Sequence, residues 1–132
     1  MTFVDSSAFI AQLDHDEANH LDAKRLWNVL VDSNEELLST NYVVVETYAV
    51  LQRKLGMDGV IAFSTNLLPL VELAWVDERT HSEAVRTFIE ANRRWLSVVD
   101  CTSFRIMQHL GIPNVFCFDP HFAEQGFNIL KP

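Results

Sequence analysis

Short apolar segments alternate with longer amphipathic segments along the whole chain, and this alternation limits the folds open to it. The apolar segments are TFV (2–4), ELLST (36–40), LVELAWV (70–76), LSVV (96–99), VFCF (115–118) and FNIL (127–130). They are mostly apolar throughout, which is typical of strands buried on both faces of a parallel sheet. We therefore predict an α/β protein: a three-layer α/β/α sandwich with a central, mainly parallel sheet of about five strands.

The segments between these strands carry helix signals. Helices are expected over 6–13, 15–31, 41–55, 58–68, 77–93 and 100–110, with a short helical turn from Pro120. Asn41 is expected to cap its helix and Gly56 to end it. The inward-facing candidates are Leu21, Ala23, Leu26, Trp27 and Leu30 in the second helix, and Val85, Phe88 and Ile89 in the fifth.

The length and composition favour one globular domain spanning 1–132. The chain has 132 residues, 48% of them hydrophobic, which is sufficient for a core. No apolar run reaches the ~18 residues of a membrane span, and the first residues do not resemble a signal peptide. We expect a soluble, cytoplasmic protein without membrane association, in which Cys101 and Cys117 are buried free thiols.

The formal net charge of −8 argues against a protein coated with a nucleic-acid-binding surface. It remains compatible with a local basic rim around a metal site, because bound cations would neutralise clustered carboxylates.

Three aspartates each follow an apolar segment and precede a helix. These are Asp5, Asp100 and Asp119. Ligands of open parallel sheets bind at the carboxyl ends of the strands, so neighbouring strands would bring the three carboxylates into one cleft. Aspartate is also a favoured helix cap, and each of the three fits that role on its own. Ser, Thr or Asn would cap equally well without mutual repulsion, so three aspartates together favour the cleft.

Glu46 lies in NYVVVETYAVL, a helix that is apolar on nearly every side. A buried carboxylate needs a partner, and Arg53 and Lys54 are two turns away, where water is the more natural neighbour. A cation shared with the aspartates is the sharper explanation. Oxygen donors without a His or Cys partner favour Mg²⁺ or Mn²⁺ over zinc, and such a site is suited to phosphoryl chemistry.

Four blocks of the sequence resemble the signature blocks of PIN-domain nucleases, and most of all the VapC-type toxin ribonucleases. The blocks are VDSSAFIA, STNYVVVETYAVL, LSVVDCTSFRIMQHLGI and VFCFDPHFAEQGF, and the resemblance runs from Thr2 to Phe127. It implies a metal-dependent endoribonuclease with a four-acid site formed by Asp5, Glu46, Asp100 and Asp119, of which all four would hold Mg²⁺ or Mn²⁺.

The resemblance also implies supporting residues. Ser6, Thr40 and Ser103 match small polar positions that support the metal or its waters, although capping hydrogen bonds explain them equally well. Pro120 stands where the family often has Arg, so one phosphate contact is expected to be missing. His121 is expected to pack or hydrogen-bond, and not to act in catalysis. Arg93 and Arg94 are weaker candidates for the cleft mouth, the alternative being a solvated helix end.

The expected function is hydrolysis of RNA phosphodiesters, as the toxin of a toxin–antitoxin pair, with a small antitoxin protein and a second copy of the chain as partners. Alternatives are a non-toxin PIN-domain RNA-processing nuclease, a non-catalytic interaction module, and an aspartate-based phosphatase. The last normally has a second Asp where Ser7 stands. Four apolar side chains are candidates either for dimer or antitoxin contacts or for ordinary core: Trp27, Tyr48, Leu51 and Leu55.

Overall fold

The computed structural model describes residues 1–132 and contains one five-stranded sheet. The strands are β1 (Thr2–Val4), β2 (Leu37–Thr40), β3 (Glu72–Ala74), β4 (Asn114–Phe116) and β5 (Asn128–Ile129). Their order across the sheet is β3-β2-β1-β4-β5, and every neighbouring pair is parallel. The prediction of a parallel sheet of about five strands is confirmed.

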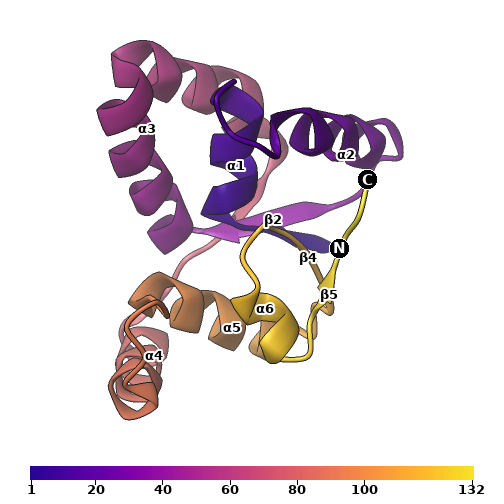
Figure 1. Cartoon of the computed structure of the whole chain (residues 1–132). Helices are drawn as coiled ribbons and strands as arrows, with labels where there is room; N and C mark the ends of the chain where they lie inside the picture. The colour runs from indigo at the N-terminus through magenta and orange to yellow at the C-terminus, as the bar shows by residue number, and fades with distance from the viewer.

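Helices cover both faces of this sheet (Figure 1). One layer contains α1 (Ser6–Leu13), α2 (His20–Asp32) and α3 (Asn41–Ala62), and the other contains α4 (Glu78–Ala91), α5 (Val98–Leu110) and α6 (His121–Glu124). Within the layers, α1 packs on α2 and α3, and α5 packs on α4 and α6. The three-layer α/β/α architecture is therefore as predicted.

The sheet reverses its direction of growth at β1. Thr2 pairs with Leu37 of β2 on one side and with Asn114 of β4 on the other. The chain builds β2 and β3 outward from β1, then crosses over to place β4 on the opposite side. Such a switch point opens a crevice beyond the carboxyl ends of the two central strands, where α/β proteins bind ligands. Asp5 directly follows one of these strands and Asp119 closely follows the other.

One continuous core of 29 buried hydrophobic residues joins the sheet to both helical layers. Its largest fully buried side chains include Phe3, Phe9, Phe63, Phe116 and Phe122. The four apolar side chains considered for partner contacts also belong to this core or pack against it: Trp27, Tyr48, Leu51 and Leu55. Trp27 and Leu51 are buried, and Tyr48 and Leu55 are partly buried, which favours the core alternative.

The predicted strand LSVV is wrong. Ser97 is the N-cap of α5, and Val98 and Val99 form its first turn. The Ser97 hydroxyl accepts a hydrogen bond from the backbone of Asp100, and the Asp100 carboxylate accepts one from the backbone of Ser97. This reciprocal capping box fixes a helix start and outweighs the β-propensity of the two valines.

Other features also differ from the sequence-based expectations. The second helix begins at His20 instead of residue 15. Two side chains predicted to face inward are exposed: Leu21 on α2 is 67% exposed, and Ile89 on α4 is 66% exposed. Gly56 does not end α3 but kinks it, with φ 70° and ψ −163°. That conformation is open to glycine and strained for other residues, so the chain changes direction and continues as helix. A π-helical turn (Phe63–Leu67) and a 3₁₀ turn (Leu68–Leu70) follow α3.

None of the helices combines the length and the apolar character needed to cross a bilayer. Cys101 and Cys117 are both buried and free.

Candidate active site

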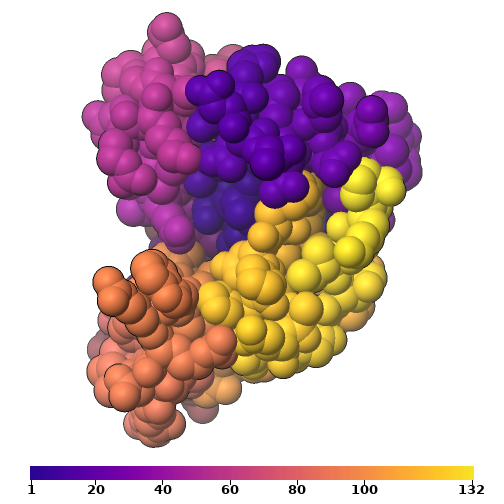
Figure 2. Space-filling model, in the orientation of Figure 1, coloured from indigo at the N-terminus to yellow at the C-terminus, as the bar shows by residue number.

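A cavity of about 430 Å³ lies at the carboxyl edge of the sheet, and all four predicted acids line it: Asp5, Glu46, Asp100 and Asp119. They come from four separate segments, namely the start of α1, the second turn of α3, the first turn of α5 and the loop after β4. Figure 2 shows this face of the molecule hollowed where the magenta α3, the indigo α1 and the golden C-terminal segment meet.

Asp5 is held from two sides. Its backbone N–H donates to the carbonyl of Phe116 on β4 at 3.1 Å, which fixes it beside the neighbouring strand. Its carboxylate Oδ2 accepts from the backbone of Ser7 at 3.1 Å and from the Ser7 hydroxyl at 2.6 Å. Asp5 is therefore the N-cap of α1, as the capping interpretation predicted, and its carboxylate still lines the cavity.

Asp100 reaches the same cavity by a route that differs from the one predicted. It sits in the first turn of α5, three residues after the cap Ser97, and not at the end of a strand. The backbone of Ser97 donates to its Oδ2 at 3.1 Å. The layer that contains α5 packs beneath the sheet, so the helix start, instead of a strand end, carries this carboxylate to the crevice.

Asp119 follows β4 by three residues. Its Oδ1 accepts from the backbone N–H of His121 at 2.8 Å, which anchors the first turn of α6. Across Asp5, Asp100 and Asp119, these positioning hydrogen bonds fall on one carboxylate oxygen each. The second oxygen of each carboxylate is left for another partner.

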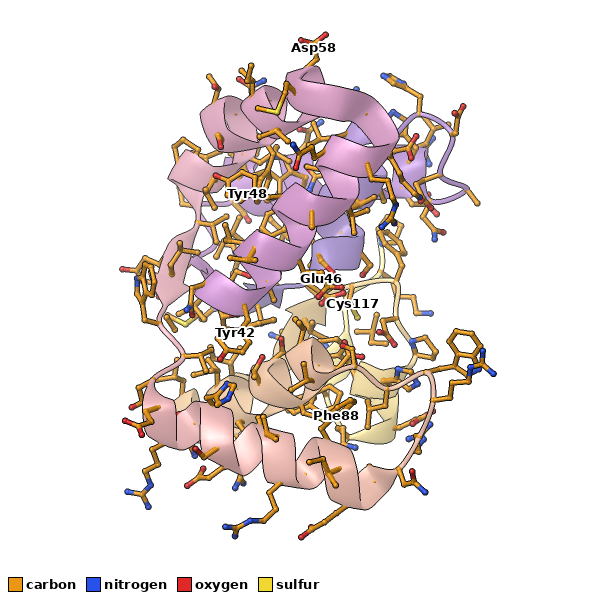
Figure 3. The ribbon with its side chains drawn as sticks, turned by 90° about the vertical axis from the view of Figure 1, so that its left-hand side faces the viewer. Tyr42, Glu46, Tyr48, Asp58, Phe88 and Cys117 are labelled. Carbon is orange, nitrogen blue, oxygen red and sulfur yellow. The ribbon has the colours of Figure 1, made fainter.

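Glu46 approaches from the opposite helical layer. Figure 3 shows it pointing from α3 toward the space between the two layers. It is half-buried, and no cation is paired with it. Burial, followed by the charges of Asp5 and Asp100, raises its pKa to about 7. The Ser6 hydroxyl opposes this shift through a hydrogen bond to the carboxylate.

The site concentrates negative charge. Burial raises the pKa of Asp5, which is 3% exposed, and burial together with Asp119 raises the pKa of Asp100 to about 6. Lys54 is the only cationic residue lining the cavity, and it lies 2.9 Å from Glu17 and 3.8 Å from Asp14. No Lys or Arg is therefore paired with any of the four site acids, and either protons or bound cations must neutralise them.

This donor set fits a divalent cation with oxygen ligands. Carboxylates that line a shared cavity and have lone pairs without a hydrogen-bond donor are the ligands that Mg²⁺ and Mn²⁺ take. Such an ion would also offset the burial and the repulsion that raise the pKa values of Glu46 and Asp100. A site of this kind can bind a phosphate group and support its hydrolysis.

The predicted supporting residues have different surroundings. Ser6 lines the cavity, whereas Thr40 and Ser103 do not. The Thr40 hydroxyl accepts from the backbone of Val43 at 3.1 Å and caps α3, which is the alternative role that the sequence allowed. The predicted cap Asn41 is therefore wrong: it is the first residue of the helix. The Ser103 hydroxyl is buried and has no hydrogen-bond partner.

Sequence reasoning missed Ser7 as a supporting residue. Its hydroxyl donates to Asp5 Oδ2 and accepts from the backbone N–H of Phe118 at 3.0 Å. One side chain thus ties the start of α1 to the loop that carries Asp119, across 111 residues of sequence. The sequence did contain one indication of this role, because Ser7 lies two residues after the capping Asp5, where a side chain can contact the cap.

The two arginines occupy different surroundings. Arg93 pairs with Glu124 at 2.8 Å and lines a separate depression with Phe88 and Asn92, so it does not line the acidic cavity. Arg94 also lies outside the cavity lining, but its guanidinium sits 5.0 Å from the ring centre of Trp95. Trp95 is 78% exposed and does line the cavity, which places an aromatic face and a cation at its mouth.

His121 comes closer to the acids than the sequence suggested. Its Nδ1 lies 2.9 Å from Asp119 Oδ1 and 3.7 Å from Asp100 Oδ2, and its side chain is 12% exposed. The sequence analysis expected oxygen donors without a histidine beside them, and this is wrong, because His121 lies beside Asp119 and Asp100.

Comparisons with known proteins agree with this geometry. The PIN domain family model matches residues 2–128, so the chain belongs to the PIN domain family. It is 32% identical to the 23S rRNA-specific endonuclease VapC20 of Mycobacterium tuberculosis, in strain CDC 1551 / Oshkosh and in strain H37Rv, over 100% of this chain and 99% of that protein.

The crystal structure of M. tuberculosis VapC20, described as a Sarcin-Ricin loop cleaving toxin, is similar to this chain with a TM-score of 0.85 and 31% identity. The similarity covers 100% of both chains. The resemblance to PIN-domain nucleases of the VapC type is thereby confirmed.

Proposed function

We propose that this protein is a metal-dependent endoribonuclease that acts as a VapC-type toxin. The observation that carries the proposal is the convergence of Asp5, Glu46, Asp100 and Asp119 on one cavity without a paired Lys or Arg. The full-length similarity to an rRNA endonuclease supports RNA as the substrate class. The metal would be Mg²⁺ or Mn²⁺, because the free donors are carboxylate oxygens.

In this proposal each acid has a defined task. Asp5, Asp100 and Asp119 would hold the ion through carboxylate lone pairs that their capping hydrogen bonds leave free. Glu46 holds it from the other layer, directly or through water. A bound ion would supply an activated water and would neutralise charge on the phosphate. The water oxygen bonds to phosphorus as the bond to the 3′ oxygen breaks, which leaves 5′-phosphate and 3′-hydroxyl ends.

Although the protein is acidic, residues at the rim of the cavity can bind RNA. Trp95 exposes an aromatic face on which a base can stack, and Arg94 lies over that ring. Lys54 on the opposite rim offers a cation that a phosphate can share with Glu17. The weak candidate Arg94 therefore stays in the proposal at the mouth, whereas Arg93 is engaged by Glu124.

The proposed substrate is structured RNA with an exposed loop, and large-subunit rRNA containing the sarcin–ricin loop is the first RNA to test. Purified protein with Mn²⁺ or Mg²⁺ should cleave RNA, chelator should stop cleavage, and Glu46→Gln should abolish it. Glu46 caps no helix, so we expect its substitution to lower activity without unfolding the protein. Glu17→Gln, which removes another acid of the same cavity, is the matched control and should stay active. Equal activity of wild type and Glu46→Gln would contradict the proposal.

The protein partners follow from the proposed toxin role. A small antitoxin would cover the cavity, and a second copy of the chain would form a homodimer. A mainly apolar depression of about 330 Å³, lined by Tyr42, Val45 and Val99 beside Glu46, is an exposed surface that supports such contacts. Light scattering of the purified chain tests the dimer, and rescue of growth by the neighbouring reading frame tests the antitoxin.

A further inference from the structure

We propose that His121 is a nitrogen ligand of the site and that it makes this chain prefer Mn²⁺ over Mg²⁺. The inference rests on the proposed metal-dependent function and adds a ligand that the four-acid site does not include.

The backbone aims the imidazole at the acids. Asp119 accepts the backbone N–H of His121 at 2.8 Å, so the short α6 starts by folding back on that carboxylate. The side chain then places Nδ1 2.9 Å from Asp119 Oδ1 and 3.7 Å from Asp100 Oδ2. Two elements that are not adjacent in sequence, α5 and the loop after β4, thus meet at one ring nitrogen.

The Nδ1 atom is buried and has no hydrogen-bond partner. Nδ1 is within ion-pair distance of Asp119 Oδ1, but the angle between the two groups does not allow a hydrogen bond. A buried polar atom without a partner costs about 1–3 kcal/mol and requires an explanation. A cation bound between the three side chains would use this nitrogen.

The spacing suits a single ion. Donor atoms of Asp100, Asp119 and His121 lie within 4.8 Å of one another. Ligand bonds of about 2.1 Å allow two ligand atoms to be at most about 4.2 Å apart. Nδ1 lies 2.9 Å from Asp119 Oδ1 and 3.7 Å from Asp100 Oδ2, and both distances fall within that limit. Each of these oxygens accepts one capping hydrogen bond and keeps a lone pair for an ion.

The identity of the donor sets the selectivity. Mg²⁺ takes oxygen ligands almost exclusively, whereas imidazole suits the later divalent metals and Mn²⁺ accepts both. Replacing one oxygen ligand by a nitrogen therefore favours Mn²⁺. Loss of the imidazole should weaken Mn²⁺ binding by about tenfold or more, the scale seen when groups around a metal are removed, and should change Mg²⁺ binding far less.

The test uses the purified full chain loaded with Mn²⁺ alone, without RNA. Pulsed electron paramagnetic resonance should detect coupling of the ion to an imidazole nitrogen in the wild type. His121→Gln, which keeps a hydrogen-bonding amide, should lose that coupling and bind Mn²⁺ more weakly by calorimetry. His109→Gln alters an imidazole of α5 that is 51% exposed, and should match the wild type in both measurements. His121→Asn gives a second variant, should the glutamine variant fail to fold.

No nitrogen coupling in the wild type, or unchanged Mn²⁺ affinity in the His121 variants, would overturn the inference. Nitrogen coupling in a protein that cleaves no RNA would support the ligand and contradict the proposed function. RNA cleavage by a protein without nitrogen coupling would support the proposed function and contradict His121 as a ligand.

Discussion

Ser97 and Asp100 bind each other across the first turn of α5. The backbone N–H of Ser97 donates to Asp100 Oδ2 at 3.1 Å, and the backbone N–H of Asp100 donates to Ser97 Oγ at 3.0 Å. The same contact that starts the helix therefore orients a carboxylate of the candidate site.

Ser97→Ala should affect both stability and metal binding. The loss of the cap should lower the free energy of unfolding by about 1 kcal/mol. Asp100 should also lose its fixed orientation, so Mn²⁺ affinity should fall. Asp77→Ala removes the cap of α4, where Asp77 accepts from Thr80 at 2.8 Å, and should destabilise the fold by a similar amount without changing Mn²⁺ affinity. Denaturant unfolding and calorimetry measure the two effects, and equal metal affinities in Ser97→Ala and wild type would refute the coupling.

Ser7→Ala should loosen the link between Asp5 and the loop that carries Asp119. The hydroxyl binds Asp5 and the backbone of Phe118 together, so its loss leaves a partly buried N–H without a partner. We expect a loss of about 1–3 kcal/mol in stability and a fall in kcat. Ser33→Ala, which removes a hydroxyl bonded only to the carbonyl of Leu30, is the control and should keep full activity.

The metal-free protein should lose stability as pH rises through the range from about 4.5 to about 7. Glu46 has its ordinary pKa of 4.5 when unfolded and a pKa of about 7 when folded, so the folded state binds more protons in this interval. Raising the pH removes those protons and exposes the repulsion among the acids. Asp100, with a folded pKa of about 6, acts in the same direction.

Glu46→Gln removes this pH dependence at one position. At pH 8 without metal, the variant should unfold with a free energy roughly 1–3 kcal/mol above that of the wild type, because one unit of pKa shift corresponds to about 1.4 kcal/mol and the side chain is only half-buried. At pH 4 the two proteins should match closely. Thermal unfolding at both pH values, with chelator present, provides the measurement. A constant difference across pH would contradict the assignment.

Trp95→Ala should raise KM for RNA by about tenfold and change kcat little, since base stacking on an aromatic side chain contributes about 1–3 kcal/mol. Trp95→Phe should retain most of the affinity. Trp75 is 73% exposed but lies outside the cavity lining, so Trp75→Ala should leave both constants unchanged. If Trp95→Ala cleaves RNA with the KM of the wild type, the ring is not a binding surface.

The sequence was sufficient for the parallel sheet, because its strands are short, apolar and separated by helical segments. It misjudged residues 96–99 because two valines suggest a strand, whereas the deciding contact is the reciprocal bond between Ser97 and Asp100. The exposure of Leu21 and Ile89 was missed for a related reason: periodicity identifies an apolar face but not how much of it the neighbouring elements cover.

The four acids were identified from their types and positions, and the cavity contains all of them. What the sequence could not provide is three-dimensional proximity beyond strand ends. Ser7 and His121 reach the site through side-chain directions set by α1 and α6, and Arg93 is drawn away by Glu124 from a different element. Those relationships arise only when the layers pack.

The pairing of β1 with β4 has a consequence for how the protein is made. Asp5 is near the start of the chain, and its backbone binds Phe116, close to the end. A growing chain that has not yet added β4 lacks both the strand that fixes Asp5 and the loop that carries Asp119. The candidate site therefore cannot form before β4 and the loop after it have been synthesised, and a translation product that stops earlier would lack the contacts that build it.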